Sequence, residues 1–399
     1  MQGRTATTVM LGVAQTLAWA SSYYLPAVLA TSISKDIGVS ASTVFGAFSV
    51  ALLVAAGVGP YAGRFIDRLG GRPVLVASNL MFAIGLGGLS QATQAWHMFA
   101  AWAVLGLAMG SGLYEAAFAT VVRLHGQDAR RSITGITLFA GFASTVGWPL
   151  SAYLESTAGW REACLVWAAL HLVVGMPLNA LLPRARQAAA MLKDTAAGVT
   201  DGAGLSPAQQ RYAAVLMAFV FAVTWFISTA MAAHFPDLLL ASGVTFAAAV
   251  GIAALVGPAQ VAGRVFEFAF LKGGHPLLSA RLAILAHPLG ALCLGLFGAP
   301  AAMSFAVLHG LGNGILTIAV GTLPLLVFGA KGYGQRQGFL MVPARIVQAG
   351  SPFLFGLAVQ KWAVGALWIS SGAALLACGA LALMAADFRR PGIQRVEAS

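Results

Sequence analysis

Charged residues are scarce in this 399-residue chain, where Asp, Glu, Lys and Arg together make up 9% of the sequence. That scarcity, beside 59% hydrophobic residues, excludes a soluble domain, in which about 25% of residues are charged. Cysteine is scarce as well. Cys164, Cys293 and Cys378 all fall within apolar segments and in no metal-like spacing. The sequence therefore predicts neither a disulfide framework nor a metal site, and we interpret the three cysteines as small core residues.

Signatures of catalysis are missing too. The sequence contains no phosphate-binding loop, no catalytic triad pattern and no metal-ligand spacing. ATP-driven pumping and membrane enzymology therefore have no support, and we expect neither enzyme activity nor a cofactor. A gradient must supply the energy for any transport.

Long apolar runs dominate what is present. About twelve runs, most of them about 20 residues long, can each cross the roughly 30 Å hydrocarbon core as a helix. We therefore predict an all-α membrane protein of twelve transmembrane helices. The first six spans are 8–33, 43–62, 73–91, 96–122, 132–153 and 160–182, and the second six are 212–234, 245–263, 279–297, 301–328, 335–359 and 363–386. Two six-helix bundles, residues 1–182 and 212–399, would be joined by a polar linker over 183–211.

The net charge of +11 comes from basic residues whose positions along the chain indicate the membrane topology. With both termini in the cytoplasm, almost all basic residues fall in cytoplasmic loops and tails, and only Lys35, Arg161 and Lys361 lie outside. We therefore expect an inner or plasma membrane location, a lipid bilayer and a small-molecule substrate as partners, no nucleic acid, and a monomer.

The start of the chain also resembles a signal peptide. Its apolar run continues past Ala20, and cleavage would leave an odd number of helices, so we predict that the segment is retained.

The chain contains an internal repeat. The stretch from Gly63 to Arg72 is echoed about two hundred residues later by the stretch from Gly263 to Glu267, and Pro149 is matched by Pro352 at a spacing of 203. Since six helices separate the copies, both halves would have the same orientation, related by an axis along the membrane normal. A duplicated block of membrane helices with a basic loop after its second helix is the build expected of a secondary transporter.

The stretch from Gly63 to Arg72 matches the loop signature GxxxDRxGxR, and the chain resembles the major facilitator superfamily over essentially its whole length. The resemblance implies transport by alternating access, with Asp67 latching the cytoplasmic side through arginines and the amino end of a neighbouring helix. Alternatively, the loop arginines only enforce topology. In the second copy Glu267 replaces the aspartate. The predicted cytoplasmic gate residues are Gly63, Arg64, Asp67, Arg68, Gly70, Arg72, Arg264 and Glu267.

Two ionisable residues fall well inside predicted helices, where each costs about 2.5 to 3.5 kcal/mol. Glu115, in the fourth helix, is a candidate for proton coupling because desolvation favours its protonated form. It could instead form a static pair with Arg345 or Arg123, or stay hydrated near the cytoplasm. Arg345, in the eleventh helix, suits a carboxylate held by two parallel hydrogen bonds. It could also be a snorkelling or paired structural residue.

The region from Tyr23 through Arg161 resembles the monocarboxylate and oxalate/formate branch of the superfamily. The matching residues are Gly59-Pro60, Gly63, Asp67-Arg68, Gly70-Gly71-Arg72, Gly110-Ser111-Gly112, Tyr114 and Arg130-Arg131. A basic residue in the eleventh helix binds carboxylate in that branch, so the resemblance implies a small organic anion as substrate. The predicted substrate-binding residues are Arg345, Asn313, Tyr23, Tyr24, Trp225, His309 and Gln348.

Each of the other residues in that set, which lie in helices expected to face the cavity, could equally serve packing or membrane anchoring. Two other functions stay open at this stage. The chain could export amphipathic drugs or metabolites by proton antiport, with Arg345 structural. It could also be a non-transporting membrane sensor built on the same fold.

Overall fold

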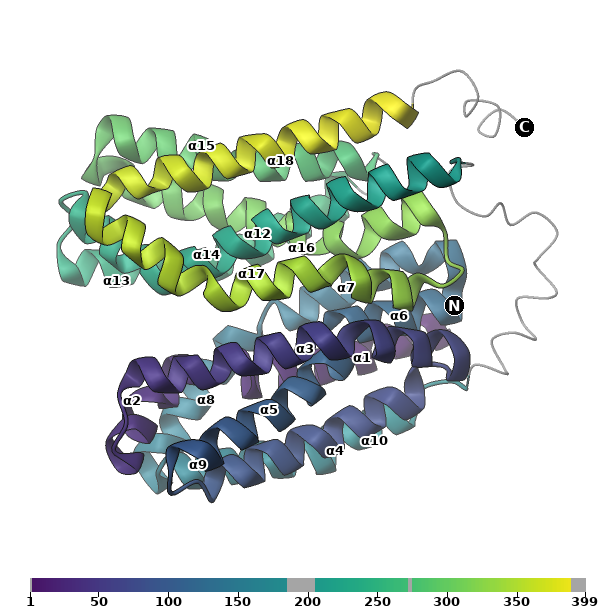
Figure 1. Cartoon of the computed structure of the whole chain (residues 1–399), viewed down its shortest axis with the longest axis horizontal. Coiled ribbons are helices and arrows are strands. Elements are labelled where there is room, and N and C mark those ends of the chain that lie inside the picture. Colours follow the sequence, from purple (N-terminus) through teal and green to yellow (C-terminus); the bar gives the residue numbers. More distant parts are fainter. Residues whose placement is uncertain (1, 185–204, 272–274, 389–399) are drawn as a thin grey trace. The chain divides into compact units, whose positions relative to one another are not determined.

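The computed structural model describes residues 2–184, 205–271 and 275–388, and within these ranges it contains helices and no strand (Figure 1). Nine helical segments of this described part are long and apolar enough to cross a membrane. The prediction of an all-α membrane protein is confirmed.

Contacts divide the chain into two compact units. Within the described residues, the N-terminal unit takes in everything up to residue 184 together with Ala330–Val342, and the C-terminal unit takes in the remainder. Residues 185–204 of the predicted 183–211 linker lie outside the described residues. The linker and the bounds of the two bundles therefore stay predictions.

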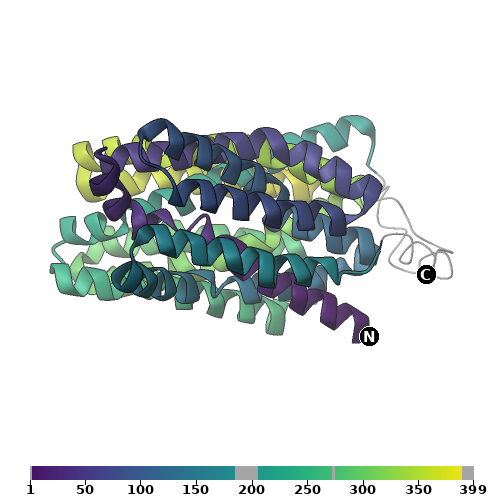
Figure 2. The same ribbon diagram turned by 90° about the horizontal axis from the view of Figure 1, so that it is seen from below.

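Up to residue 184, the N-terminal unit is built from ten α-helices with one 3-10 turn and one π turn, and the start of helix α17 (Tyr333–Trp362), as far as Val342, also belongs to it. They are α1 (Gln2–Ser21), α2 (Pro26–Ile37), α3 (Ala41–Leu69), α4 (Gly71–Ser90), α5 (Ala95–Gly112), α6 (Tyr114–His125), η1 (Gly126–Ala129), α7 (Arg130–Ala140), α8 (Ala143–Ala158), α9 (Trp160–Leu170), η2 (His171–Gly175) and α10 (Met176–Ala180). Figure 2 shows the same helices turned by 90°.

The C-terminal unit begins at α12 and follows the same style of long helices joined by short turns. Its elements are α12 (Pro207–Ala241), α13 (Phe246–Ala254), α14 (Val256–Phe266), η3 (Glu267–Leu271), α15 (Pro276–Phe297), η4 (Ala299–Ala301), α16 (Ala302–Phe328), α17 (Tyr333–Trp362), η5 (Ala363–Gly365) and α18 (Ala366–Phe388). In Figure 1, α15 and α18 run side by side, in agreement with their packing. Helix α17 changes unit at Pro343, which lacks the N–H of a regular helical bond.

Four predicted spans are wrong as single helices. The spans 8–33, 96–122, 132–153 and 245–263 are each divided in two, into α1 and α2, α5 and α6, α7 and α8, and α13 and α14. A hydropathy pattern reports apolar length and not backbone continuity, so it does not detect such breaks.

The break in the first span has a local cause. The hydroxyl oxygens of Ser21 and Ser22 lie 2.8 and 2.5 Å from the carbonyl oxygens of Leu17 and Ala18, and hydroxyl groups that bond back to the preceding turn bend a helix. Pro26 then opens α2 at a position where it needs no N–H. Tyr23 and Tyr24 lie within the break.

The break in the fourth span occurs at Leu113, whose backbone is extended with ψ of −163°. This turn removes the carbonyl oxygen of Gly112 from the helical ladder, and the Gln15 side chain of α1 donates to it at 2.6 Å. The buried amide therefore satisfies a backbone group that would otherwise be costly in a membrane.

Small residues let the helices of each unit pack closely. A Cβ on Gly106 or Gly110 of α5 would lie within 3.0 Å of the α3 backbone at Ala51 or Ala55. In α16, a Cβ on Gly310 would lie 2.7 Å from the carbonyl oxygen of Val256. Both units therefore depend on backbone approach through glycine, as membrane helices generally do.

Candidate functional site

The predicted gate loop is a turn of one residue. Helix α3 ends at Leu69, α4 begins at Gly71, and Gly70 alone joins them with φ of +88°. That backbone conformation favours glycine because any other side chain would clash. The loop signature therefore encodes a sharp corner, and its exposed arginines, Arg64 and Arg68, lie on α3 beside it.

Asp67 lies one turn before this corner and binds the amino end of α17. Its Oδ1 accepts the backbone N–H of Gly334 at 2.9 Å, and its Oδ2 accepts that of Gln335 at 2.8 Å. Both amides belong to the first turn of α17, where helical N–H groups have no partner within the helix. The carboxylate thus caps this helix and meets the positive end of its dipole. Arg123 and Arg336 also interact with it electrostatically.

Glycines allow this contact to form. A Cβ on Gly63 would overlap the carbonyl group of Gly334, and one on Gly334 would lie 2.6 Å from the carbonyl oxygen of Gly63. Further along, a Cβ on Gly338 would lie 2.6 Å from Pro60. The α3 backbone and the start of α17 therefore touch directly, and Gly63 serves this contact rather than the turn.

Glu115 lies near the same region. It is the second residue of α6, directly after the break at Leu113, and its side chain is partly exposed. Both Glu115 and Asp67 interact electrostatically with the buried hydroxyl group of Tyr333, the first residue of α17. Within the N-terminal unit, Glu115 therefore shares a neighbour with the gate aspartate.

The second copy of the gate motif is built differently. Arg264 and Glu267 are 4% and 3% exposed, whereas the N-terminal Arg64 and Arg68 are exposed. Arg264 lies in the last turn of α14, and Glu267 begins the π turn η3. The two copies therefore differ in burial as well as in sequence.

Arg345 lies in α17, inside the C-terminal unit, and is 4% exposed. Its Nη1 donates to Oε1 of Gln348 at 2.9 Å, and its guanidinium carbon lies 5.1 Å from the ring centre of Trp225 in α12. Trp225 and Gln348 are buried as well. The structure thus brings three predicted binding residues together, with the guanidinium plane oriented by an amide on one side and a ring on another.

Two other predicted residues of the C-terminal unit lie on α16. Asn313 is half-buried, and the glycines beside it serve helix packing. A Cβ on Gly312 or Gly314 would overlap the backbone of Ala283 in α15 or Gln260 in α14. His309 is buried, and its Nδ1 lies 3.1 Å from Nδ1 of His287. Their roles as ligands stay predictions.

Tyr23 and Tyr24 belong to an aromatic cluster of the N-terminal unit. Tyr23 contacts Trp19 and Phe48 edge-on, with ring centres 5.2 and 5.5 Å apart, and Tyr24 contacts Trp148 in the same way at 5.8 Å. The two tyrosines are half-buried, and Trp148 is 45% exposed. The cluster gathers rings from α1, the break, α3 and α8.

Sequence reasoning missed most of these partners. Phe48 and Trp148 read as ordinary apolar residues, and the amino end of α17 carries no motif of its own. A signal existed at Gly338, which repeats Gly135 at a spacing of 203 residues and marks where α17 meets α3.

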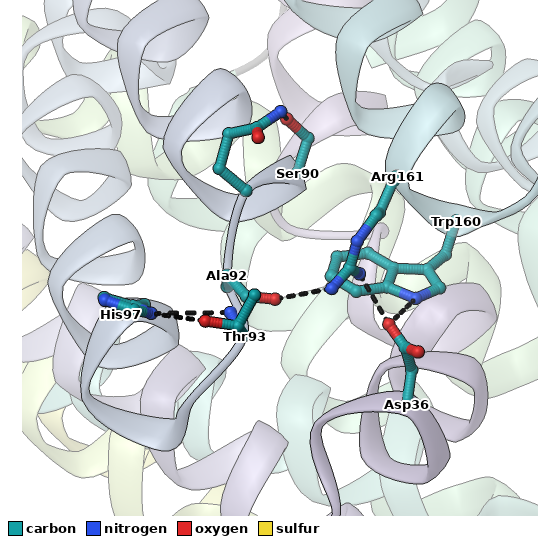
Figure 3. Close-up of polar contacts among 8 residues, drawn as sticks. Asp36, Ser90, Ala92, Thr93, His97, Trp160 and Arg161 are labelled. Carbon is teal, nitrogen blue, oxygen red and sulfur yellow. Dashed lines mark hydrogen bonds and ion pairs between the residues drawn. The ribbon is translucent and has the colours of Figure 1, made fainter.

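At the start of α9, the side chain of Arg161 connects three segments of the N-terminal unit (Figure 3). Its Nη1 donates to Asp36 at 2.6 Å and its Nη2 to the carbonyl oxygen of Ala92 at 2.8 Å. Trp160 Nε1 donates to the same carboxylate at 3.1 Å, and the guanidinium stacks on the Trp160 ring. This arginine, predicted to lie outside, therefore joins α2, α9 and the α4–α5 turn.

Two solved structures share this fold. The structure of the human organic anion transporter MFSD10 (TETRAN) superposes with a TM-score of 0.71 and 17% identity, over 95% of this chain and 99% of that chain. The proton:xylose symporter XylE superposes with a TM-score of 0.75 and 12% identity, over 94% of each chain. At these identities the likeness shows the fold alone.

A protein of Thermoproteus tenax, described as an uncharacterized 38 kDa protein in a 23S RNA operon, is 27% identical over 360 residues, or 90% of this chain and 89% of that protein. The sequence model of the Major Facilitator Superfamily matches residues 11–323. The chain therefore belongs to the major facilitator superfamily, whose members are transporters.

Proposed function

We propose that this protein is a secondary active transporter of a small organic anion, with Arg345 as the anion-binding residue. The observation that supports this best is the setting of that arginine, which is buried in a membrane-spanning helix and oriented by Gln348 and Trp225. An ionised group in such a place is costly and usually functional. Its planar fork matches a carboxylate through two parallel hydrogen bonds.

The fold alone does not identify the substrate. A sugar symporter and an organic anion transporter both share it, and fold-level likeness carries no substrate information. The proposal of an anion, and the assignment to the monocarboxylate and oxalate/formate branch, rest on the residues of this chain. Within the C-terminal unit, Asn313 and His309 would supply further polar contacts to the substrate. Within the N-terminal unit, the aromatic cluster around Tyr23 and Tyr24 would offer an apolar surface to a substrate.

Alternating access would use the contact between Asp67 and α17. Because that contact consists of two hydrogen bonds and a close backbone approach, it is either formed or broken, as a two-state latch requires. We propose that Arg264 and Glu267 stabilise the corresponding part of the C-terminal unit. The latch side would face the cytoplasm of an inner or plasma membrane, together with both termini, in keeping with the positive loops.

Proton coupling is assigned to Glu115. Its place beside the helix break and near Tyr333 would let its charge act on the same helix end that Asp67 caps. Loss of that charge on protonation would then favour separation of α17 from α3.

A second candidate function is export of amphipathic drugs or metabolites by proton antiport. The half-exposed rings of Tyr23, Tyr24 and Trp148 favour it, because aromatic faces bind apolar and cationic groups alike. In that case Arg345 would be structural.

Thermal stabilisation of the purified protein separates the two. A panel of small carboxylates, neutral solutes and lipophilic cations would be tested on the wild type and on Arg345→Ala. A ligand at 100 times its Kd stabilises the folded state by about 2.7 kcal/mol. Stabilisation by carboxylates that is lost in the variant supports the anion site. Stabilisation of both proteins by lipophilic cations alone would favour the exporter.

A further inference from the structure

A buried polar network lies inside the N-terminal unit, centred on the imidazole of His171. Its Nε2 lies 2.7 Å from Oγ of Ser21, and its Nδ1 lies 2.9 Å from Oδ1 of Asn79. All three side chains are at most 4% exposed. The ring of Phe82 stacks on the imidazole with centres 4.5 Å apart and planes inclined by 18°. One titratable group thus links α1, α4 and the π turn η2.

The hydrogen positions follow from the partners. Asn79 donates through Nδ2 to the carbonyl oxygen of Leu75 at 2.8 Å, so its Oδ1 is the atom that faces His171. An amide oxygen only accepts hydrogen bonds. Nδ1 of His171 therefore carries a hydrogen in every protonation state.

The hydroxyl of Ser21 has two possible acceptors. It lies 2.7 Å from Nε2 of His171 and 2.8 Å from the carbonyl oxygen of Leu17. When His171 is neutral, Ser21 donates to Nε2. When His171 is charged, Nε2–H donates to Ser21 Oγ, and the hydroxyl hydrogen turns to Leu17. Both protonation states are fully hydrogen-bonded with the same heavy-atom positions.

The local backbone is shaped around this network. The π turn η2 begins at His171 and ends at Gly175, and such turns are frequent at functional sites. A Cβ on Gly175 would overlap Oδ1 of Asn79. Glycine at this position therefore leaves the amide free to face the imidazole.

The network also connects to the break in the first helix. Ser21 is the last residue of α1, and the half-buried Tyr23 and Tyr24 follow it in the break. A movement of the break would therefore displace the Ser21 hydroxyl from His171. Conversely, the proton on Nε2 decides whether Ser21 bonds to the imidazole as donor or as acceptor.

Nearby charges do not stabilise a charged ring. The elements packed against η2 are α1, α4, α9 and α10. Their titratable groups within the described residues are Arg4 on α1, Arg72 on α4, and Arg161, Glu162 and Cys164 on α9, and none of these acts on His171. Burial without a counter-charge disfavours the imidazolium. The closed network therefore favours the neutral ring.

We propose that His171 is a proton-binding site of the transport cycle, loaded when the break between α1 and α2 opens to water and unloaded when the network closes. This proposal rests on the proposed transport function and extends it, since His171 would be a second proton-binding residue besides Glu115. It differs from a purely structural role because the two partners are arranged for both protonation states.

The His287 and His309 pair of the C-terminal unit provides the contrast. Ser370 donates to the carbonyl oxygen of Leu367 at 3.0 Å, so it accepts from Nε2 of His287 at 2.9 Å, and Nδ1 of His287 then accepts from His309. All these groups are satisfied with both rings neutral. A proton added to His287 would require the hydrogen of His309 to move from Nδ1 to Nε2, a rearrangement that the His171 network does not need, so this pair serves as an internal control.

The test is nitrogen-15 NMR of the full chain in lipid nanodiscs, with labelled histidine and the proton as the only ligand. The His171 signals are assigned by their loss in His171→Gln. We expect the wild-type ring to pass from the Nδ1–H neutral form to the imidazolium on acidification. Asn79→Asp should raise the midpoint by about 1 to 3 pH units, because a carboxylate stabilises the charged ring.

Ser21→Ala should lower the midpoint, because the charged ring loses the stronger hydrogen bond. His287 and His309 should stay neutral throughout. A wild-type His171 that takes up no proton before the protein unfolds, or midpoints that neither substitution moves, would overturn the proposal. The titration needs no transported substrate. A negative titration would therefore refute the role of His171 and not the proposed transport function, and a negative transport assay would refute the transport function and not the titration of His171.

Discussion

Substitution of Asp67 by asparagine should open the contact between α3 and α17. The carboxylate accepts two backbone hydrogen bonds from the first turn of α17, at 2.9 and 2.8 Å. The amide of asparagine has one acceptor oxygen, so one of these bonds is lost, and the negative charge at the positive end of the helix is lost with it.

The magnitude follows from these two losses. A hydrogen bond to a charged group contributes about 1.5 to 3 kcal/mol, and a charge at a helix end about 0.3 to 1 kcal/mol. Because Asp67 is only partly buried, we take the lower ends, which sum to about 2 kcal/mol. Since each 1.4 kcal/mol is a factor of ten, the ratio of open to closed protein should rise about 30-fold.

Pulsed electron spin resonance between labels at two exposed positions, Leu69 and Lys331, measures this ratio directly. Asp67→Asn should add or enlarge a population at longer distance. The matched control is Asp128→Asn, since Asp128 is an exposed aspartate paired with Arg4. An unchanged distance distribution in Asp67→Asn, or an equal change in the control, would refute the latch.

Three further substitutions test other parts of the account. Arg345→Lys keeps the charge and loses the planar fork, so uptake should fall at least about tenfold while the protein stays folded, as measured in proteoliposomes. Gly70→Ala places a side chain at φ of +88° and should cost about 1 to 2 kcal/mol, seen as a lower melting temperature. Arg161→Ala removes the bonds to Asp36 and Ala92 and should also lower the melting temperature, without changing the affinity of any ligand.

The sequence predicted the fold class and the location of the long apolar segments, because apolar length reports directly on a bilayer. It did not predict the breaks at Leu113 and after Ser21, since a break depends on backbone angles and on hydroxyl groups that also occur in unbroken helices. The gate motif could be read from Gly63 to Arg72, with the amino end of a neighbouring helix as a partner of Asp67. The sequence did not show that this helix is α17, since a helix end has no side-chain signature.

The candidate substrate site was predictable in part. Arg345 stands out because a charge in an apolar run is rare, and Gln348 follows it at the spacing of one helical turn. Trp225 lies 120 residues before Arg345 and was predicted from its residue type alone, and only the structure shows its ring beside the guanidinium. The network of His171 could not be foreseen, because Ser21 and Asn79 belong to other helices and no spacing in the sequence connects them.

Counterflow in proteoliposomes tests the central claim most directly. Vesicles loaded with a small unlabelled carboxylate would be diluted into the labelled compound, with wild-type protein and Arg345→Ala reconstituted side by side. The account predicts transient accumulation of label with the wild type and none with the variant. Accumulation that is equal in both, or that occurs for lipophilic cations and for no carboxylate, would contradict it.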